Sequence, residues 1–209
     1  MVDSKGRVAA HTGRRCVPSA GHAVGNGFSC QGNIMANDRV WGAMKSAFDS
    51  KAELPLPERL MAALDAAQEE GGDLRGKQSS AMLVVGPDAR PNGWEGRLVD
   101  LRVEDHQEPL MELRRLLRFQ AGYRWIDKGD DFFSSNRMDE ALEAYSKGME
   151  LVPEVLELKY WVAGPKAVRR RASGRGPAED SPGVARSHSP GQAGGVHQVR
   201  RRHRDEGPP

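Results

Sequence analysis

The composition of residues 164–209 constrains the fold of this chain more than any other feature of its sequence. This stretch contains no Leu, Ile, Met, Phe, Trp or Tyr, so it cannot bury an apolar core and is expected to be disordered. Residues 1–163 must therefore supply the packed structure, and they are long enough for one domain with an appendage. The stretch also holds about ten basic against about four acidic residues, whereas the body before it is mildly acidic.

Two interpretations of this tail are open. The composition changes at Gly164-Pro165, inside an expected helix, and Arg, Gly, Pro and Ala dominate the rest of the chain, which favours a shifted reading frame in GC-rich DNA. The alternative is an RNA-binding arm built on the arginine triplets at 169–171 and 200–202. The tail lacks aromatic side chains on which bases could stack, which argues against nucleic acid as a partner.

Hydropathy argues against a membrane protein. The sequence has no run of about 18 apolar residues, and its first ten residues, "MVDSKGRVAA", lack the apolar core of a signal peptide. Its two cysteines do not make a disulfide framework. We therefore expect a cytoplasmic chain without membrane contact, provided that Met1 is the true start.

Residues 1–120 have the pattern of an α+β domain, with short strands, two helices and then strands again. The predicted strands are residues 22–24, 28–33, 79–85 and 97–105. The predicted helices begin near Asn37, Pro57 and Pro109, and we expect Asn37 to cap the first of them. Residues 79–85 are apolar throughout, as expected for a strand that is covered on both faces. Residues 3–6 have turn chemistry and predict an N-terminal hairpin with a very short first arm.

Residues 121–163 follow the pattern of a tetratricopeptide-like repeat, in which small residues let two antiparallel helices approach and aromatic side chains fill the seam. The positions in register are Trp125, Gly129, Phe132, Ala141, Tyr145, Gly148 and Pro153. Residues 156–163 match the opening of a second repeat, so we predict one and a fraction repeats. We interpret the aromatic residues as repeat core rather than as a ligand cage. A single repeat cannot bury its own faces and must pack on the α+β domain or stay loose.

Residues 11–35 contain both cysteines and two histidines, which raises the question of a metal or nucleophile site. The spacing includes neither a C-x-x-C nor an H-x-x-x-H pair, so we expect no metal. A disulfide between Cys16 and Cys30, a Cys/His nucleophilic pair and two free thiols are the open alternatives.

The loop "GGDLRGKQS" at residues 71–79 offers charge and hydrogen bonds around an anion or a carbonyl group, chiefly from Asp73, Arg75 and Gln78. Alternatively, Asp73 and Arg75 pair with each other and the loop is a polar connection. The loop matches neither G-x-G-x-x-G nor the phosphate-loop pattern, so we expect no nucleotide or other cofactor.

Three stretches together resemble one protein family: "GRVAAHTGRRCVPSAGHAVGNGFSCQGNIM", "GGDLRGKQSSAMLVV" and "RLVDLRVEDHQEPLMELRRLL". Over residues 1–120 they resemble the C-terminal half of the bacterial and archaeal family called domain of unknown function 1028. The resemblance implies part of an αββα sandwich of the N-terminal-nucleophile (Ntn) hydrolase type, and a parent protein that hydrolyses amide bonds. One departure is Pro18-Ser19, where an aromatic residue is expected before Ala-Gly-His.

In Ntn chemistry the nucleophile is the first residue of the mature chain, and its own α-amine serves as the general base. The resemblance implies a start roughly 60 residues earlier, so we expect this chain to lack the nucleophile and to be inactive. The candidate substrate pocket contains Cys30, Gln31, Asn33, Asp73, Arg75 and Gln78. The alternative function is a non-catalytic scaffold that binds a peptide or protein partner through the repeat, and a homo-oligomer is compatible with either.

Overall fold

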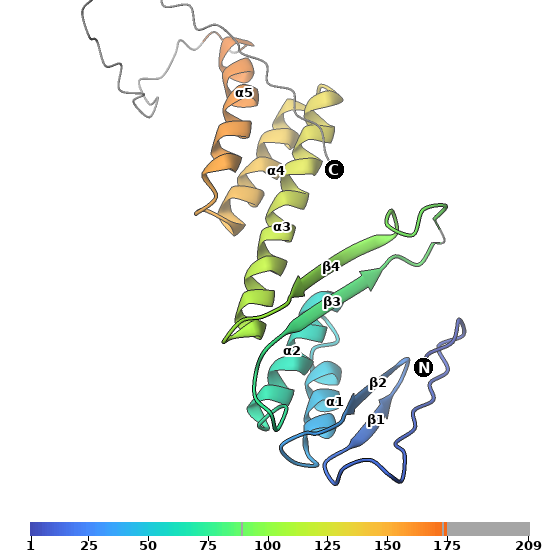
Figure 1. Ribbon diagram of the computed structural model, residues 1–209. Helices are drawn as coiled ribbons and strands as arrows, with labels where there is room; N and C mark the ends of the chain where they lie inside the picture. Colours follow the sequence, from blue (N-terminus) through green and yellow to red (C-terminus); the bar gives the residue numbers. More distant parts are fainter. Residues whose placement is uncertain (89, 173, 175–209) are drawn as a thin grey trace, which may run out of the picture.

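The computed structural model of the protein describes residues 1–88, 90–172 and 174. The elements are β1 (Gly21–Gly25), β2 (Phe28–Gly32), α1 (Val40–Ser50), α2 (Leu56–Glu69), β3 (Ser80–Val85), β4 (Arg97–Val103), α3 (Pro109–Ser134), α4 (Met138–Leu151) and α5 (Leu156–Ala172). This mixture of helices and antiparallel strands confirms the α+β class. Figure 1 shows the strands with α1 and α2 in one part of the molecule, and α3 extending from this part to α4 and α5.

The described strands form two separate antiparallel hairpins, β1–β2 and β3–β4. The first turns at Asn26-Gly27, where Gly27 takes the left-handed conformation (φ +80°), which glycine adopts without a steric penalty. The second contains an irregularity in register between Val84 and Val85. The four predicted strands are thus confirmed to within about two residues at each end. The predicted N-terminal hairpin with its short first arm is present: Val2 bridges Val8, and the Asp3 and Ala9 N–H groups donate to the Arg7 and Met1 carbonyl oxygens, both at 3.0 Å.

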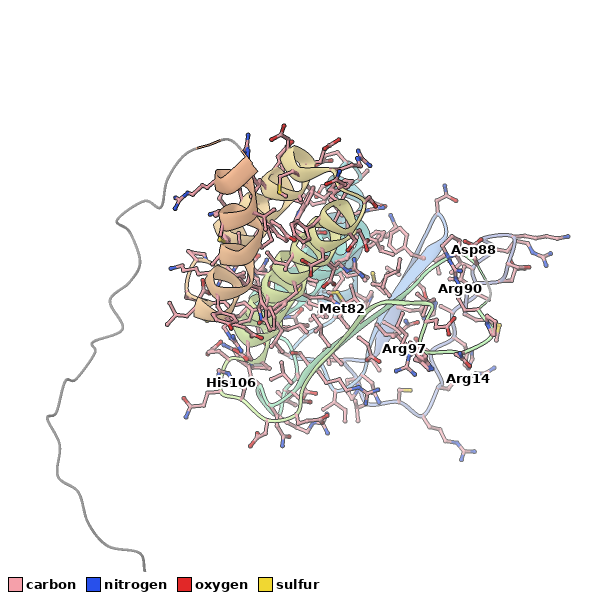
Figure 2. All side chains as sticks on the ribbon, turned by 90° about the horizontal axis from the view of Figure 1, so that it is seen from above. Arg14, Met82, Asp88, Arg90, Arg97 and His106 are labelled. Carbon is pink, nitrogen blue, oxygen red and sulfur yellow. The ribbon has the colours of Figure 1, made fainter. Side chains whose placement is uncertain are left out.

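β3 is covered on one face, so the prediction that both faces are covered is wrong for the described chain. Met82 and Val84 are buried in a core with Met61 of α2 and residues of β4 and α3. On the other face Leu83 and Val85 are 59% and 62% exposed. Successive side chains of a strand point to opposite faces, and the described helices pack on only one of them. Figure 2 shows Met82 close to the helices, and Asp88, Arg90 and Arg97 at the far end of the hairpin.

The predicted capping role of Asn37 is wrong, because α1 begins at Val40 and Asn37 serves a different contact. Its Oδ1 accepts a hydrogen bond from the Arg39 backbone N–H at 2.8 Å, and its Nδ2 donates to the Glu70 carbonyl oxygen at 2.5 Å. Asn37 therefore joins the start of α1 to the end of α2. The glycines at 71 and 72 have positive φ and end α2, as predicted.

Small residues lie in the seam between α3 and α4, as the sequence predicted for this helical hairpin. Gly129 is buried against the ring of Tyr145, and Gly122 is buried against Val152 and the carbonyl oxygen of Gly148. The buried Tyr145 hydroxyl donates to Asp130 Oδ1 at 2.6 Å. The helices can therefore approach closely. The assignment of the hairpin to the tetratricopeptide class stays a prediction.

The predicted domain boundaries fall inside helices. Gln120 lies within α3, which runs unbroken from Pro109 and contacts β3, β4 and α4. Ala163 lies within α5, which continues through Gly164 and Pro165 to Ala172. The predicted disorder is therefore wrong for residues 164–172, and residues 175–209, where the rest of that prediction falls, lie outside the described residues.

Helix α5 continues past the change in composition because its buried stripe continues. Leu158 and Val162 are buried against α4, and Pro165, one helical turn further on, is buried as well. Residues at this spacing share one face of a helix. Burial of Pro165 on this face offsets part of the cost of a proline inside a helix, which lacks the backbone N–H.

Candidate functional site

A cavity of about 580 Å³ is lined by β2 of the first hairpin, β3 of the second, and the helices α1 and α2. Figure 1 shows how these elements are arranged. We call this cavity the interstrand cavity. Its two walls and its floor are formed chiefly by Phe28, Ser29 and Cys30 of β2, Ala81 and Leu83 of β3, and Met44, Phe48, Leu60 and Leu64 of the helices. Strands β1 and β4 do not line it, so the cavity lies on the side of each hairpin away from its paired strand. The lining is mostly apolar.

Cys30 places a thiol in the wall of the interstrand cavity. It is 6% exposed and lies opposite Ala23 in the hairpin. Burial raises the pKa of the Cys30 thiol and the Asp49 carboxylate raises it further, while Lys45 acts in the opposite direction. A thiol with a raised pKa is protonated at neutral pH and is a weak nucleophile. Cys30 is therefore suited to contact a ligand rather than to attack one.

Arg59 of α2 contributes a positive charge to the lining of the cavity. Its Nε and Nη2 both donate to the Phe48 carbonyl oxygen, at 3.3 and 3.2 Å. The guanidinium carbon lies 3.9 Å from the centroid of the Phe48 ring. Within the described part of the chain, no carboxylate forms an ion pair with Arg59. Sequence reasoning missed this residue, because an arginine early in an amphipathic helix looks like any solvated helix residue.

The structure separates Cys30 from the other predicted pocket residues. Gln31 is exposed on the opposite face of β2, where the Ser29 hydroxyl donates to its Oε1 at 3.4 Å. Asn33 is exposed in the following loop. That loop runs beside the loop of Asp73, since the Leu74 N–H donates to the Ile34 carbonyl oxygen at 2.9 Å.

Asp73 and Arg75 bind each other, which is the local pairing that the sequence left open. Arg75 Nη2 lies 2.7 Å from Asp73 Oδ2, and the Arg75 backbone N–H and Nε donate to Oδ1 at 2.8 and 3.0 Å. The Arg75 guanidinium lowers the pKa of Asp73 to about 2. Gln78 is exposed, and its carbonyl oxygen accepts a hydrogen bond from the His106 N–H at 2.9 Å. None of these three residues lines the interstrand cavity.

Thr12 and His22 form a hydroxyl–imidazole pair that sequence reasoning did not find. Thr12 Oγ1 lies 2.6 Å from His22 Nδ1, and both side chains are half-buried. A nucleophile and its base have this geometry, but neither residue lines the interstrand cavity. The contact holds the N-terminal segment on β1. It also occupies one of the two ring nitrogens of His22 and leaves Nε2 outside this contact.

Cys16 and Cys30 are free thiols, so they do not form the disulfide that the sequence left open. Across the described ranges, His, Cys, Asp and Glu side chains do not gather into a group of three that could hold a metal ion. None of the described helices is long and apolar enough to cross a membrane. The cytoplasmic location stays a prediction.

The fold is that of an α+β unit with an interstrand cavity and a helical extension. Residues 1–113 match the family described as "Family of unknown function (DUF1028)", and the protein belongs to this family. A crystal structure of a Silicibacter pomeroyi protein of the same family is similar, with 33% identity and a TM-score of 0.46 over 56% of this chain and 48% of that chain. The chain thus spans about half the length of that solved relative. No functionally curated protein matches the sequence.

Proposed function

We propose that the α+β unit provides the ligand-binding part of an amide-hydrolysing protein of the Ntn-hydrolase type, and that this chain does not catalyse the hydrolysis. The interstrand cavity carries the proposal. Its volume of about 580 Å³ and its apolar lining with a few polar groups are typical of ligand sites, whose volumes run from about 300 to 1,000 Å³.

The groups in the cavity support binding rather than catalysis. A serine or cysteine nucleophile needs an adjacent base or a lowered pKa. The pKa of Cys30 is raised instead, and the Ser29 hydroxyl donates to the side chain of Gln31 rather than to a base. Among the residues that line the cavity there is no histidine and no carboxylate.

The Cys30 thiol provides a direct test of ligand binding. In a Cys16→Ser chain it is the only thiol, and we expect it to react with DTNB at least about ten-fold more slowly than Cys16 does in a Cys30→Ser chain. Leu60→Trp, which enlarges a side chain on the floor of the cavity, should slow the reaction further. Trp at the exposed position of Ala52 is the matched control and should leave the rate unchanged.

A panel of N-acyl amides and p-nitroanilides then tests the function itself. We expect some of these compounds to slow the reaction of Cys30 with DTNB, and none of them to be hydrolysed. Turnover by the purified chain would overturn the absence of catalysis. If no compound protected Cys30, the cavity would not be the ligand site.

A second function, protein binding, is supported by an uncovered face of α5. Leu156 and Tyr160 lie one helical turn apart and are 73% and 74% exposed, and Trp161 beside them is exposed as well. Exposed apolar patches of this kind mark interaction surfaces. Lys159 and Lys166 are exposed on the same helix. Glu157 also lies on this face, where its Oε1 accepts a hydrogen bond from Trp161 Nε1 at 3.3 Å. We propose that the face binds an amphipathic helix of a partner protein through its exposed apolar side chains.

A synthetic helical peptide of Glu and Leu heptads tests this second function. We expect it to bind the full chain, and Tyr160→Ser to weaken binding by about ten-fold or more through loss of apolar contact. Met111→Ser removes an equally exposed apolar side chain from the first turn of α3 and is the matched control. Equal binding by both variants would overturn the assignment. Concentration-dependent dimers that Tyr160→Ser abolishes would assign the face to a homo-oligomer instead.

A further inference from the structure

The edge of β3 that borders the interstrand cavity is open and unprotected. Its sequence, "SAMLVV", contains no charge and no proline, and the only irregularity in its register lies at its far end, between Val84 and Val85. Within the described residues, β3 pairs with β4 alone. Proteins usually protect such edges with lysine, proline or bulges, because an open edge pairs readily with another extended chain. This edge is therefore a template for an added strand.

The floor of the cavity fits the side chains of an added strand. A strand beside β3 would point every second side chain at the helices below it. There it would meet Phe48 of α1 and Leu60 and Leu64 of α2, which are half-buried or buried and line the cavity. An extended segment with apolar residues at alternate positions would cover these side chains. The cavity volume of about 580 Å³ suits a short peptide rather than a folded element.

Arg59 adds a requirement for negative charge. A guanidinium has five N–H donors, and the two hydrogen bonds of Arg59 both go to the Phe48 carbonyl oxygen. Its remaining donors have no carboxylate partner in the described part of the chain, although the side chain is half-buried against the Phe48 ring. A planar guanidinium with free donors binds a carboxylate through two parallel hydrogen bonds.

We propose that the interstrand cavity binds a short extended peptide with an apolar C-terminal residue. The peptide backbone pairs with the open edge of β3, its alternate side chains contact the floor, and its terminal carboxylate binds Arg59. The inference rests on the proposed function, because it names the ligand class of the same cavity. A peptide with a newly formed carboxylate is also what hydrolysis of a longer amide would release.

The test uses the full chain and dansyl-Thr-Val-Thr-Val-Leu with a free carboxylate, compared with the same peptide as its C-terminal amide. We expect the acid to bind at least about ten-fold more tightly, since it alone gains a charged hydrogen bond. Arg59→Gln should abolish this preference, and Arg59→Lys should retain part of it. Arg102→Gln, which removes an exposed arginine outside the cavity, should leave the preference unchanged. Equal binding of acid and amide by the native chain would overturn the assignment of Arg59.

Backbone pairing is tested by changing the ligand, which leaves the fold of the protein intact. N-methylation of alternate peptide bonds removes donors that would bind β3 and should weaken binding by about five-fold or more. Amide exchange in β3 should slow when the native peptide binds. Decanoate that bound as tightly as the peptide, without slowing exchange in β3, would show a site for apolar carboxylates and overturn strand pairing. If amides protect Cys30 but no peptide binds, this inference fails and the proposed function stands.

Discussion

At the scale of single residues, Gly129 and Tyr145 set how closely α3 and α4 approach. A Cβ at position 129 would lie 2.4 Å from atoms of the Tyr145 ring, which is buried and cannot move aside. We expect Gly129→Ala to lower the free energy of unfolding by about 2 to 3 kcal/mol, the usual effect of overpacking. Urea denaturation followed by circular dichroism measures this change.

Gly164→Ala is the matched control for this substitution. Gly164 is also a helical glycine, but it is exposed and an added Cβ would meet no atom within 4 Å. Alanine should therefore stabilise α5 by up to about 1 kcal/mol through its higher helix propensity. If alanine at both positions stabilised the protein, the seam between α3 and α4 would not be tightly packed.

The ion pair of Asp73 and Arg75 predicts a pH dependence. The pKa of Asp73 is lowered to about 2 from its ordinary value of 3.8. The folded state therefore binds the proton less readily than the unfolded state, so the contribution to stability is present above pH 3.8 and is lost as the pH falls towards 2. Both side chains are solvent-exposed enough that the contribution is small.

Arg75→Gln should raise the pKa of Asp73 towards its ordinary value, which carboxyl chemical shifts in an NMR titration would report. Asp3 provides an internal control, because Arg7 lowers its pKa in a separate ion pair. An unchanged Asp73 titration in the Arg75→Gln chain would mean that the pair does not form in solution.

At the scale of elements, local sequence was sufficient where local interactions decide the structure. The Asn26-Gly27 turn and the start of α3 at Pro109 were predictable, because both depend on backbone preferences of neighbouring residues. Asn37 was assigned wrongly because its partner, Glu70, lies 33 residues away. The open face of β3 was equally hidden, since covering a strand depends on which layers the rest of the chain supplies.

The same distinction applies to the candidate site. Cys30 could be singled out from composition, and the strand period places it in the wall of the cavity rather than on the outer face with Gln31. Local pairing of Asp73 with Arg75 could be stated as an alternative, since the two lie only two positions apart in the sequence. The role of Arg59 could not be predicted from the sequence, because it depends on Phe48 of another helix and on the strand across the cavity.

Pro165 gives a prediction at the level of a helix. Proline in a helix interior costs about 3 kcal/mol relative to alanine, while the burial lost with two ring carbons is worth about 1.6 kcal/mol. We therefore expect Pro165→Ala to raise the free energy of unfolding by about 1 kcal/mol and to strengthen the helical circular dichroism signal. Pro57→Ala is the control. Pro57 lies in the first turn of α2, where no backbone N–H is needed, so its replacement should not bring the same gain in the free energy of unfolding. A Pro165→Ala chain that was less stable would show that packing of the ring dominates.

At the scale of the whole molecule, α3 joins two cores. Its first half contributes Leu113 to the core with β3, β4 and α2, and its second half contributes Ile126 to the core with α4 and α5. A 26-residue helix is about 39 Å long, so the two cores lie well apart along it. The hydrogen bond from Gln120 Nε2 to the Leu98 carbonyl oxygen at 3.3 Å ties the middle of α3 to β4.

This arrangement predicts that the two cores open separately. Leu113→Ala and Leu158→Ala each remove a fully buried side chain and should cost roughly 3 kcal/mol of local stability. Hydrogen exchange should then speed up in β3 and β4 for Leu113→Ala, and in α4 and α5 for Leu158→Ala, with the other core unchanged. If either substitution accelerated exchange in both cores alike, α3 would couple them into one cooperative unit. A ligand in the interstrand cavity would then also stabilise α5 and the surface that it presents, whereas separate cores would leave the two binding functions independent.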